Sequence, residues 1–114
     1  MAKKNKPKKG QTNPFNPDYF SCASDYSQSE VWNTDNVLAQ LIAPRLLAFK
    51  ELDKHGFCPD FKSMTEWNQA IQQMIDAFEL LIDEDKLGIF TNDEEEAIEH
   101  GLELFCKYFR YLWD

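Results

Sequence analysis

The chain has 114 residues and a formal net charge of −8, with 43% hydrophobic and 14% aromatic residues. This length fits a single domain, which can bury enough apolar surface to be stable without disulfides or a metal. Its three cysteines are an odd set and predict reduced thiols, as in a reducing cytosol. The negative charge argues against a nucleic-acid-binding domain, because phosphate recognition requires clustered Lys and Arg.

The charge is unevenly distributed along the chain. Five lysines lie among the first nine residues, whereas from residue 10 onward seven Lys and Arg stand against twenty Asp and Glu. We therefore expect a flexible basic tail over residues 1–24 and an acidic helical domain over residues 25–114. Phe15, Tyr19 and Phe20 are unusual in such a tail, and they predict an extended arm on the domain or short recognition motifs. The tail is also the only part expected to contact nucleic acid.

The first predicted helix covers residues 35–55, with Thr34 as its N-cap. Its expected apolar stripe contains Val37, Leu38, Leu41, Ile42, Leu46, Phe49 and Leu52. Pro44 lies inside this pattern and predicts a kink, or alternatively two shorter helices that meet there.

The end of this helix is predicted from its charged residues and a glycine. Lys54 and His55 are expected in the last turn, and Gly56 has the position of a C′ glycine. Upstream, residues 29–32 could form a separate short turn, and the domain would then have four helical elements instead of three.

Two further helices begin at capping-box patterns, Ser63 with Glu66 and Thr91 with Glu94. The second helix is predicted over residues 64–82. The third is predicted to continue to the C-terminus. Its expected buried stripe contains Ala97, Ile98, Gly101, Leu102, Phe105, Phe109 and Leu112. We therefore predict an all-α fold, a compact three-helix domain with an extended basic N-terminal tail.

A calcium loop is the one metal site that the sequence suggests. Asp83, Asp85 and Glu94 have the spacing of the first, third and twelfth ligands of an EF-hand loop, and Gly88 has the place of its glycine. Leu87 stands where the fifth position needs an oxygen ligand. The alternative is a linker with a turn glycine before an acidic helix start.

No other constellation predicts catalysis or a cofactor. His55 with Cys58, and His100 with Cys106, lack the spacing of a zinc site, and nothing places an orienting group beside either pair. The four glycines form no phosphate-binding loop. No apolar run approaches the length of a membrane span, and the lysine-rich start does not resemble a secretory signal. We therefore expect no enzyme, no cofactor and no membrane association.

The aromatic residues are the strongest remaining signal. Trp32, Trp67 and Trp113 are expected mainly in the core. The alternative is an exposed interaction surface at the C-terminal end, where Tyr and Trp often dominate binding energy. The candidate partner-binding residues are Tyr108, Tyr111, Trp113, Glu94, Glu95 and Glu96.

Several blocks of the sequence occur in an order that resembles a known group of proteins. They are Trp32 with Asp35, LAQLIAPRLLAFKE (38–51), Gly56, Pro59, Glu66-Trp67, Met74–Phe78 and GLELFCKYFRYLW (101–113). Over roughly Val31–Asp114 the chain resembles a group of uncharacterised small bacteriophage proteins. The resemblance implies a phage-encoded protein in the cytoplasm of an infected bacterium or in the virion, and it implies no catalytic residues.

The sequence thus predicts a non-enzymatic phage accessory protein that binds a host or viral protein through an acidic, aromatic-rich helical surface. One alternative is a virion structural or assembly protein that self-associates through its C-terminal helix. A further alternative is a calcium-binding helix–loop–helix module.

Overall fold

The computed structural model describes Tyr26 and residues 31–114, so the predicted tail and the start of the predicted turn at 29–32 lie outside the described residues. The chain divides into two units, Met1–Thr34 and Asp35–Asp114. In the first unit, Val31 and Trp32 are helical. The ordered elements that follow are α2 (Thr34–Glu51), α3 (Met64–Ile82), α4 (Asn92–Tyr108) and a 3₁₀ turn, η4 (Phe109–Tyr111). Residues 31–114 contain no strand, and the all-α, three-helix prediction is confirmed. Within the described residues, no helix has the length and hydropathy to span a bilayer.

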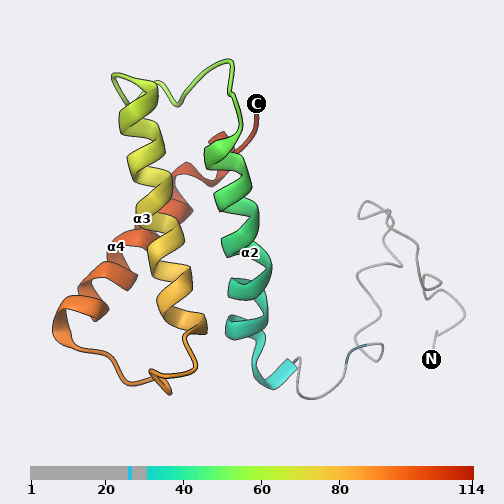
Figure 1. Cartoon of the computed structure of the whole chain (residues 1–114), viewed down its shortest axis with the longest axis vertical. Helices are drawn as coiled ribbons and strands as arrows, with labels where there is room; N and C mark the ends of the chain where they lie inside the picture. Colours follow the sequence, from blue (N-terminus) through green and yellow to red (C-terminus); the bar gives the residue numbers. More distant parts are fainter. Residues whose placement is uncertain (1–25, 27–30) are drawn as a thin grey trace, which may run out of the picture. The chain divides into compact units, whose positions relative to one another are not determined.

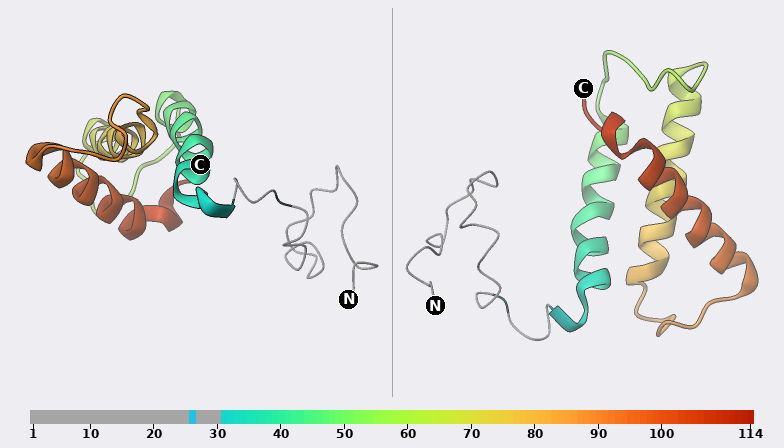
Figure 2. Two further views of the ribbon diagram at one scale, coloured as in Figure 1. Left: turned by 90° about the horizontal axis from the view of Figure 1, so that it is seen from below. Right: turned by 180° about the vertical axis from the view of Figure 1, so that it is seen from behind.

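α2 and α3 lie side by side and run in opposite directions, and α4 crosses α3 so that its end returns toward the end of α2 (Figures 1 and 2). Two polar contacts join α2 to α3. The Asn36 side-chain amide donates to the Leu81 carbonyl at 3.3 Å, and the Lys50 ammonium donates to Gln72 Oε1 at 2.6 Å. These contacts lie near opposite ends of α2, so they set the register between the two helices.

α3 supplies most of the core. Its buried residues are Trp67, Ala70, Ile71, Met74, Ile75, Ala77 and Phe78. The predicted bounds of this helix are confirmed, and the Ser63 hydroxyl accepts from the Glu66 N–H at 3.2 Å as an N-cap should. The predicted capping box is only half formed, because the Glu66 carboxylate accepts from the Lys62 N–H at 3.1 Å and not from Ser63.

α4 begins as predicted and packs closely on α3. The Thr91 hydroxyl accepts from the Glu94 N–H at 3.2 Å, and the Glu94 carboxylate accepts from the Thr91 N–H at 2.9 Å, which completes a capping box. Gly101 is buried where the two helices meet. A Cβ at this position would lie 2.4 Å from Ala77 Cβ and 2.6 Å from the Gln73 carbonyl oxygen. The absence of a side chain therefore permits this close approach of the helices.

The predicted end of the first helix is wrong. α2 ends at Glu51, so Lys54 and His55 do not lie in its last turn and Gly56 is not its C′ residue. Beyond Glu51 the buried Lys54 ammonium turns back and donates to the carbonyls of Phe49 and Lys50, at 3.1 and 2.9 Å. A side-chain cation thus satisfies terminal carbonyls that a continuing helix would have used.

The apolar stripe of α2 also differs from the prediction. Leu38, Leu41 and Leu52 are exposed, whereas the buried residues are Ala39, Ala43 and Leu46. Leucines therefore lie on both sides of α2, and small alanines let it approach the core. Pro44 is accommodated inside one continuous helix, so the alternative of two shorter helices is wrong.

The C-terminal helix does not continue to the end of the chain as predicted. α4 ends at Tyr108, and the backbone tightens into η4. The tighter turn changes the direction of the following side chains, because a 3₁₀ helix has three residues per turn instead of 3.6. Phe109, expected on the buried stripe, is consequently 60% exposed, and Leu102 on α4 is exposed as well.

Candidate binding site

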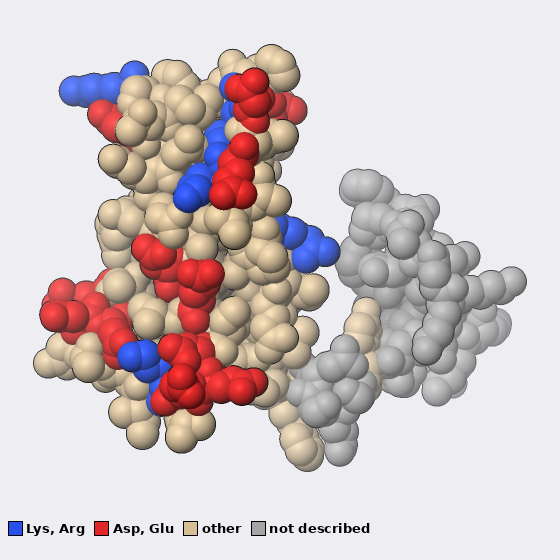
Figure 3. Space-filling model, viewed as in Figure 1, with Lys and Arg blue, Asp and Glu red and all other residues tan. Residues whose placement is uncertain are grey.

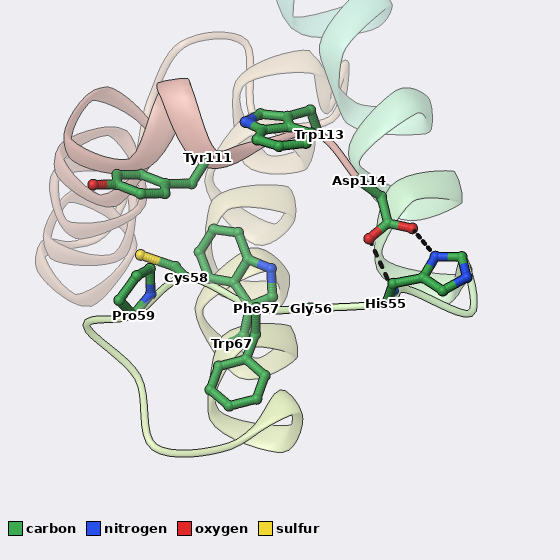
Figure 4. Close-up of a pocket in the computed structure, with 9 residues that line it drawn as sticks. All are labelled: His55, Gly56, Phe57, Cys58, Pro59, Trp67, Tyr111, Trp113 and Asp114. Carbon is green, nitrogen blue, oxygen red and sulfur yellow. Dashed lines mark hydrogen bonds and ion pairs between the residues drawn. The ribbon is translucent and has the colours of Figure 1, made fainter.

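An open, mainly apolar pocket of about 470 Å³ lies between the loop after α2 and the C-terminal segment. We call it the Trp113 pocket (Figure 4). It is lined by His55, Gly56, Phe57, Cys58, Pro59, Trp67, Tyr111, Trp113 and Asp114. Trp67 comes from the first half of α3, so residues distant in sequence form this site together.

An aromatic cluster supports the base of the pocket. Trp67 packs against Phe61 and Tyr108, with ring centroids 5.3 and 6.0 Å away, and Phe61 and Tyr108 are 5.0 Å apart. Tyr111 continues the cluster, with its ring centroid 6.3 Å from that of Tyr108. Such tilted and edge-to-face contacts are the favoured geometries for aromatic pairs.

One edge of the pocket is closed by a double hydrogen bond between His55 and Asp114. Asp114 Oδ1 accepts from the His55 backbone N–H, and Asp114 Oδ2 contacts His55 Nδ1, both at 2.9 Å (Figure 4). The His55 ring is almost fully exposed, whereas the Asp114 carboxylate is largely covered. These hydrogen bonds favour the ionised carboxylate and lower the pKa of Asp114.

Acidification is expected to release this contact. Because the pKa of Asp114 is lower in the folded chain than its ordinary value of 3.8, the stability it contributes is present above that value and lost as pH falls through the folded pKa. We therefore expect the difference in unfolding free energy between wild type and Asp114→Asn to shrink as the pH falls from about 5 to about 2. Urea unfolding of both proteins across this range tests it. An unchanged difference at pH 2 would contradict the assignment.

Cys58 and His55 line the same pocket without forming a nucleophile–base pair. The Cys58 thiol is buried near Tyr111, whereas the His55 ring lies at the opposite end of the pocket and turns its Nδ1 toward Asp114 (Figure 4). Cys106, the other described cysteine, is exposed and free. Among residues 31–114, no three His, Cys, Asp or Glu side chains gather in a way that could hold a metal ion.

A second hollow, of about 280 Å³, lies between α2 and the end of α4, and we call it the α2 groove. It is lined by Ile42, Arg45, Leu46, Phe49, Phe105, Phe109 and Leu112. The Phe105 ring packs edge-to-face on Phe78 and on Phe109, with centroids 5.0 and 5.4 Å away. Arg45 is the one charged residue that lines the groove.

The structure separates the aromatic residues that the sequence grouped as partner-binding candidates. Tyr108 is only 6% exposed and belongs to the core, so the prediction that places it in an exposed surface is wrong. Tyr111 and Trp113 are 45% and 74% exposed, and both line the Trp113 pocket. Trp32 is 78% exposed, so of the three tryptophans expected mainly in the core only Trp67 lies there.

The acidic candidates lie at the other end of the domain. Residues 63–106 contain twelve Asp and Glu and a single lysine, Lys86. Figure 3 shows acidic side chains gathered where α3 ends and α4 begins. Glu95 and Glu96 are exposed there, whereas Glu94 is half-buried and forms an ion pair with Lys86. The partner candidates thus form two separate surfaces, one aromatic and one acidic.

Two of the three predicted calcium ligands, Asp83 and Glu94, use their carboxylates in other contacts, and Asp85 takes part through its backbone N–H. Asp83 Oδ1 accepts from the Asp85 N–H at 3.0 Å, and Glu94 is held by the Thr91 N–H and by Lys86. These contacts lower the pKa of Glu94, chiefly through the hydrogen bond from Lys86. Leu87 and Gly88 both have positive φ, 50° and 77°, in a turn closed by the Ile89 N–H and the Lys86 carbonyl at 2.8 Å. These contacts are the ones expected of the linker alternative.

Three contributors to the pocket were missed by the sequence reasoning. No role is predicted from the sequence for Asp114 or Phe57, and Pro59 enters only among the blocks that carry the resemblance. No local sequence pattern predicts a contact such as His55–Asp114, because the two residues are 59 positions apart in the chain. Searches against known protein families, curated proteins and solved structures each find no match for this chain.

Proposed function

We propose that this chain is a non-enzymatic binding protein whose partner is a host or viral protein of a bacteriophage infection. The phage setting, in the bacterial cytoplasm or the virion, follows from the resemblance of residues 31–114 to small phage proteins. The binding role is supported by one observation above all: Phe109, Tyr111 and Trp113 expose three large aromatic side chains within five residues. Aromatic side chains of this kind often carry most of the energy of a protein interface.

The surroundings of these side chains support the same proposal. Phe109 lines the α2 groove, whereas Tyr111 and Trp113 line the Trp113 pocket, so two hollows flank one short segment. Leu38 and Leu41 add exposed apolar surface on α2. Large exposed apolar patches on a protein often mark a surface that binds a partner.

The acidic surface contributes mainly to the rate of encounter. It lies apart from the aromatic segment, so it does not need to be desolvated when the partner binds. A strong field of one sign accelerates association with a partner of opposite charge and loses this effect as salt rises. We therefore infer a basic partner surface, which the acidic end attracts and the aromatic end holds.

The proposal is tested by comparing two double variants of matched character. Phe109→Ala/Trp113→Ala removes exposed rings beside the hollows, whereas Leu87→Ala/Ile89→Ala removes exposed apolar side chains from the loop between α3 and α4. The tagged chains are expressed in bacteria, cross-linked and quantified by mass spectrometry. We expect a partner that wild type and the loop variant retain and the aromatic variant loses by at least about tenfold.

Two results would contradict the proposal. Equal capture of every protein by all three chains would show that the aromatic segment binds none of them. Sedimentation of the wild type as a stable dimer that only the aromatic variant dissociates would favour the assembly alternative. Circular dichroism of both variants controls for folding, which we expect to be intact because all four residues are exposed.

A further inference from the structure

We propose that the Trp113 pocket binds an organic cation, namely the ammonium or guanidinium head of a basic side chain presented by the partner. This inference rests on the proposed function and adds the chemistry of one contact. The pocket combines aromatic walls, a carboxylate at its edge and the absence of any lysine or arginine among its lining residues. No one of these features would be sufficient, but together they select positively charged ligands.

The walls offer ring surfaces to a ligand. Phe57, Tyr111 and Trp113 line the pocket with exposed rings, and Figure 4 shows the Trp113 indole across the pocket from the indole of Trp67, which is only 1% exposed. The face of an aromatic ring carries negative charge density and attracts a cation, most strongly for tryptophan. The volume of about 470 Å³ is within the range typical of small-molecule sites, so a side-chain head group fits with space for water.

The carboxylate supplies the opposite charge. Asp114 is held in place by two hydrogen bonds from His55, which favour its ionised form and lower its pKa. The two carboxylate oxygens together have four acceptor positions, which exceeds the number of donors that His55 and the Gly56 backbone direct at them, so the carboxylate can receive a further donor. A fixed carboxylate beside aromatic side chains gives a cation both a charge partner and an apolar surface.

A lysine that interacts with this carboxylate does not fill the site. The Lys54 ammonium interacts with Asp114, but it is directed inward, where it donates to the carbonyls at the end of α2. The Lys54 ammonium is therefore already hydrogen-bonded to the end of α2, and Lys54 does not line the pocket. The excess of acidic residues over the whole domain further raises the local concentration of cations and disfavours anions.

A titration with a cation and its neutral isostere tests the inference without the partner. The full chain, labelled with ¹⁵N, is titrated at pH 7.5 with choline and separately with 3,3-dimethylbutan-1-ol, which has nearly the same shape and no charge. We expect choline to shift the indole N–H signals of Trp67 and Trp113 saturably and to bind at least about fivefold more tightly than the alcohol. The Trp32 signal serves as an internal reference.

Matched variants assign the effect to the pocket. Trp113→Leu removes one exposed wall and is expected to weaken choline binding at least about fivefold, whereas Trp32→Leu removes another exposed indole and leaves it unchanged. Asp114→Asn is expected to weaken choline binding while leaving binding of the alcohol unaltered. Both features must contribute if the site recognises charge.

Three outcomes would overturn the inference. Equal affinity for choline and the alcohol would show that the pocket recognises apolar shape and not charge. The absence of saturable shifts would show that the pocket binds neither compound. Binding of choline but not of lysine amide or arginine amide would assign the pocket to a free quaternary ammonium compound and not to a partner side chain. None of these results affects the cross-linking comparison, which depends on Phe109 as well, so the two proposals can fail separately.

Discussion

Replacement of Gly101 by alanine is expected to lower the free energy of unfolding by about 2 kcal/mol or more. In an open helix the same change would be stabilising, because alanine is favoured over glycine by about 1 kcal/mol. Here the added Cβ would lie 2.4 Å from Ala77 Cβ and 2.6 Å from the Gln73 carbonyl oxygen. Both contacts involve atoms fixed to the helix backbone, so no flexible side chain can move aside and α4 must shift from α3.

Gly56→Ala provides the matched control for this prediction. A Cβ at Gly56 would meet nothing within 4 Å, so we expect a change within about 0.5 kcal/mol of wild type. Urea unfolding followed by circular dichroism at 222 nm measures both variants. If Gly101→Ala were as stable as wild type, the close approach of α3 and α4 would be refuted.

A second variant identifies the contact responsible. Ala77→Gly removes one of the two atoms that the new Cβ would meet, at the cost of a glycine within α3. If crowding is the cause, Gly101→Ala should be less harmful in the Ala77→Gly background than in the wild type. Such non-additivity is the expected behaviour of two residues in direct contact.

The parts of the fold that follow from local rules could be predicted from the sequence. The bounds of α3 and the capping box at Thr91 depend on residues within one turn of each other, and their patterns are legible without tertiary structure. The end of α2 could not be read in this way. Lys54 resembled a residue of a final helical turn, but its ammonium folds back onto carbonyls that the helix leaves open.

The aromatic residues show the same limit more clearly. Periodicity placed Phe105 and Phe109 on one buried face, but the change from α4 to η4 rotates Phe109 into solvent. Tyr108, placed among the interface candidates, instead fills the core against Trp67 and Phe61. A helix that is apolar on more than one side does not reveal which side is covered, since this depends on its packing against distant segments.

The candidate site was the least predictable feature. Its residues come from the loop after α2, from α3 and from the C-terminal segment, and they converge only after α4 has crossed α3. The contact between His55 and Asp114 has no counterpart in any local pattern. The sequence names Tyr111 and Trp113 as candidates only because Tyr and Trp often dominate the binding energy of interfaces, and the pocket that they line is not predicted in this way.

Trp67→Ala is expected to have the largest effect of any single substitution considered for this chain, a loss of about 3–5 kcal/mol of unfolding free energy. The Trp67 side chain is only 1% exposed, and its indole packs against both Phe61 and Tyr108. Truncation removes the centre of this cluster and leaves a cavity that the fixed backbone of α3 cannot close. For a domain of this size such a loss is a large fraction of the total stability.

Trp113→Ala is the control for this prediction, because it deletes the same side chain from an exposed position in the same pocket. We expect it to change stability by less than about 1 kcal/mol. Thermal and urea unfolding of the two variants therefore separate the roles of the two tryptophans: Trp67 is required for the fold, and Trp113 is available for binding. Equal losses for both would show that Trp113 is a structural residue, and the surface proposed to hold the partner would then have to be sought elsewhere on the domain.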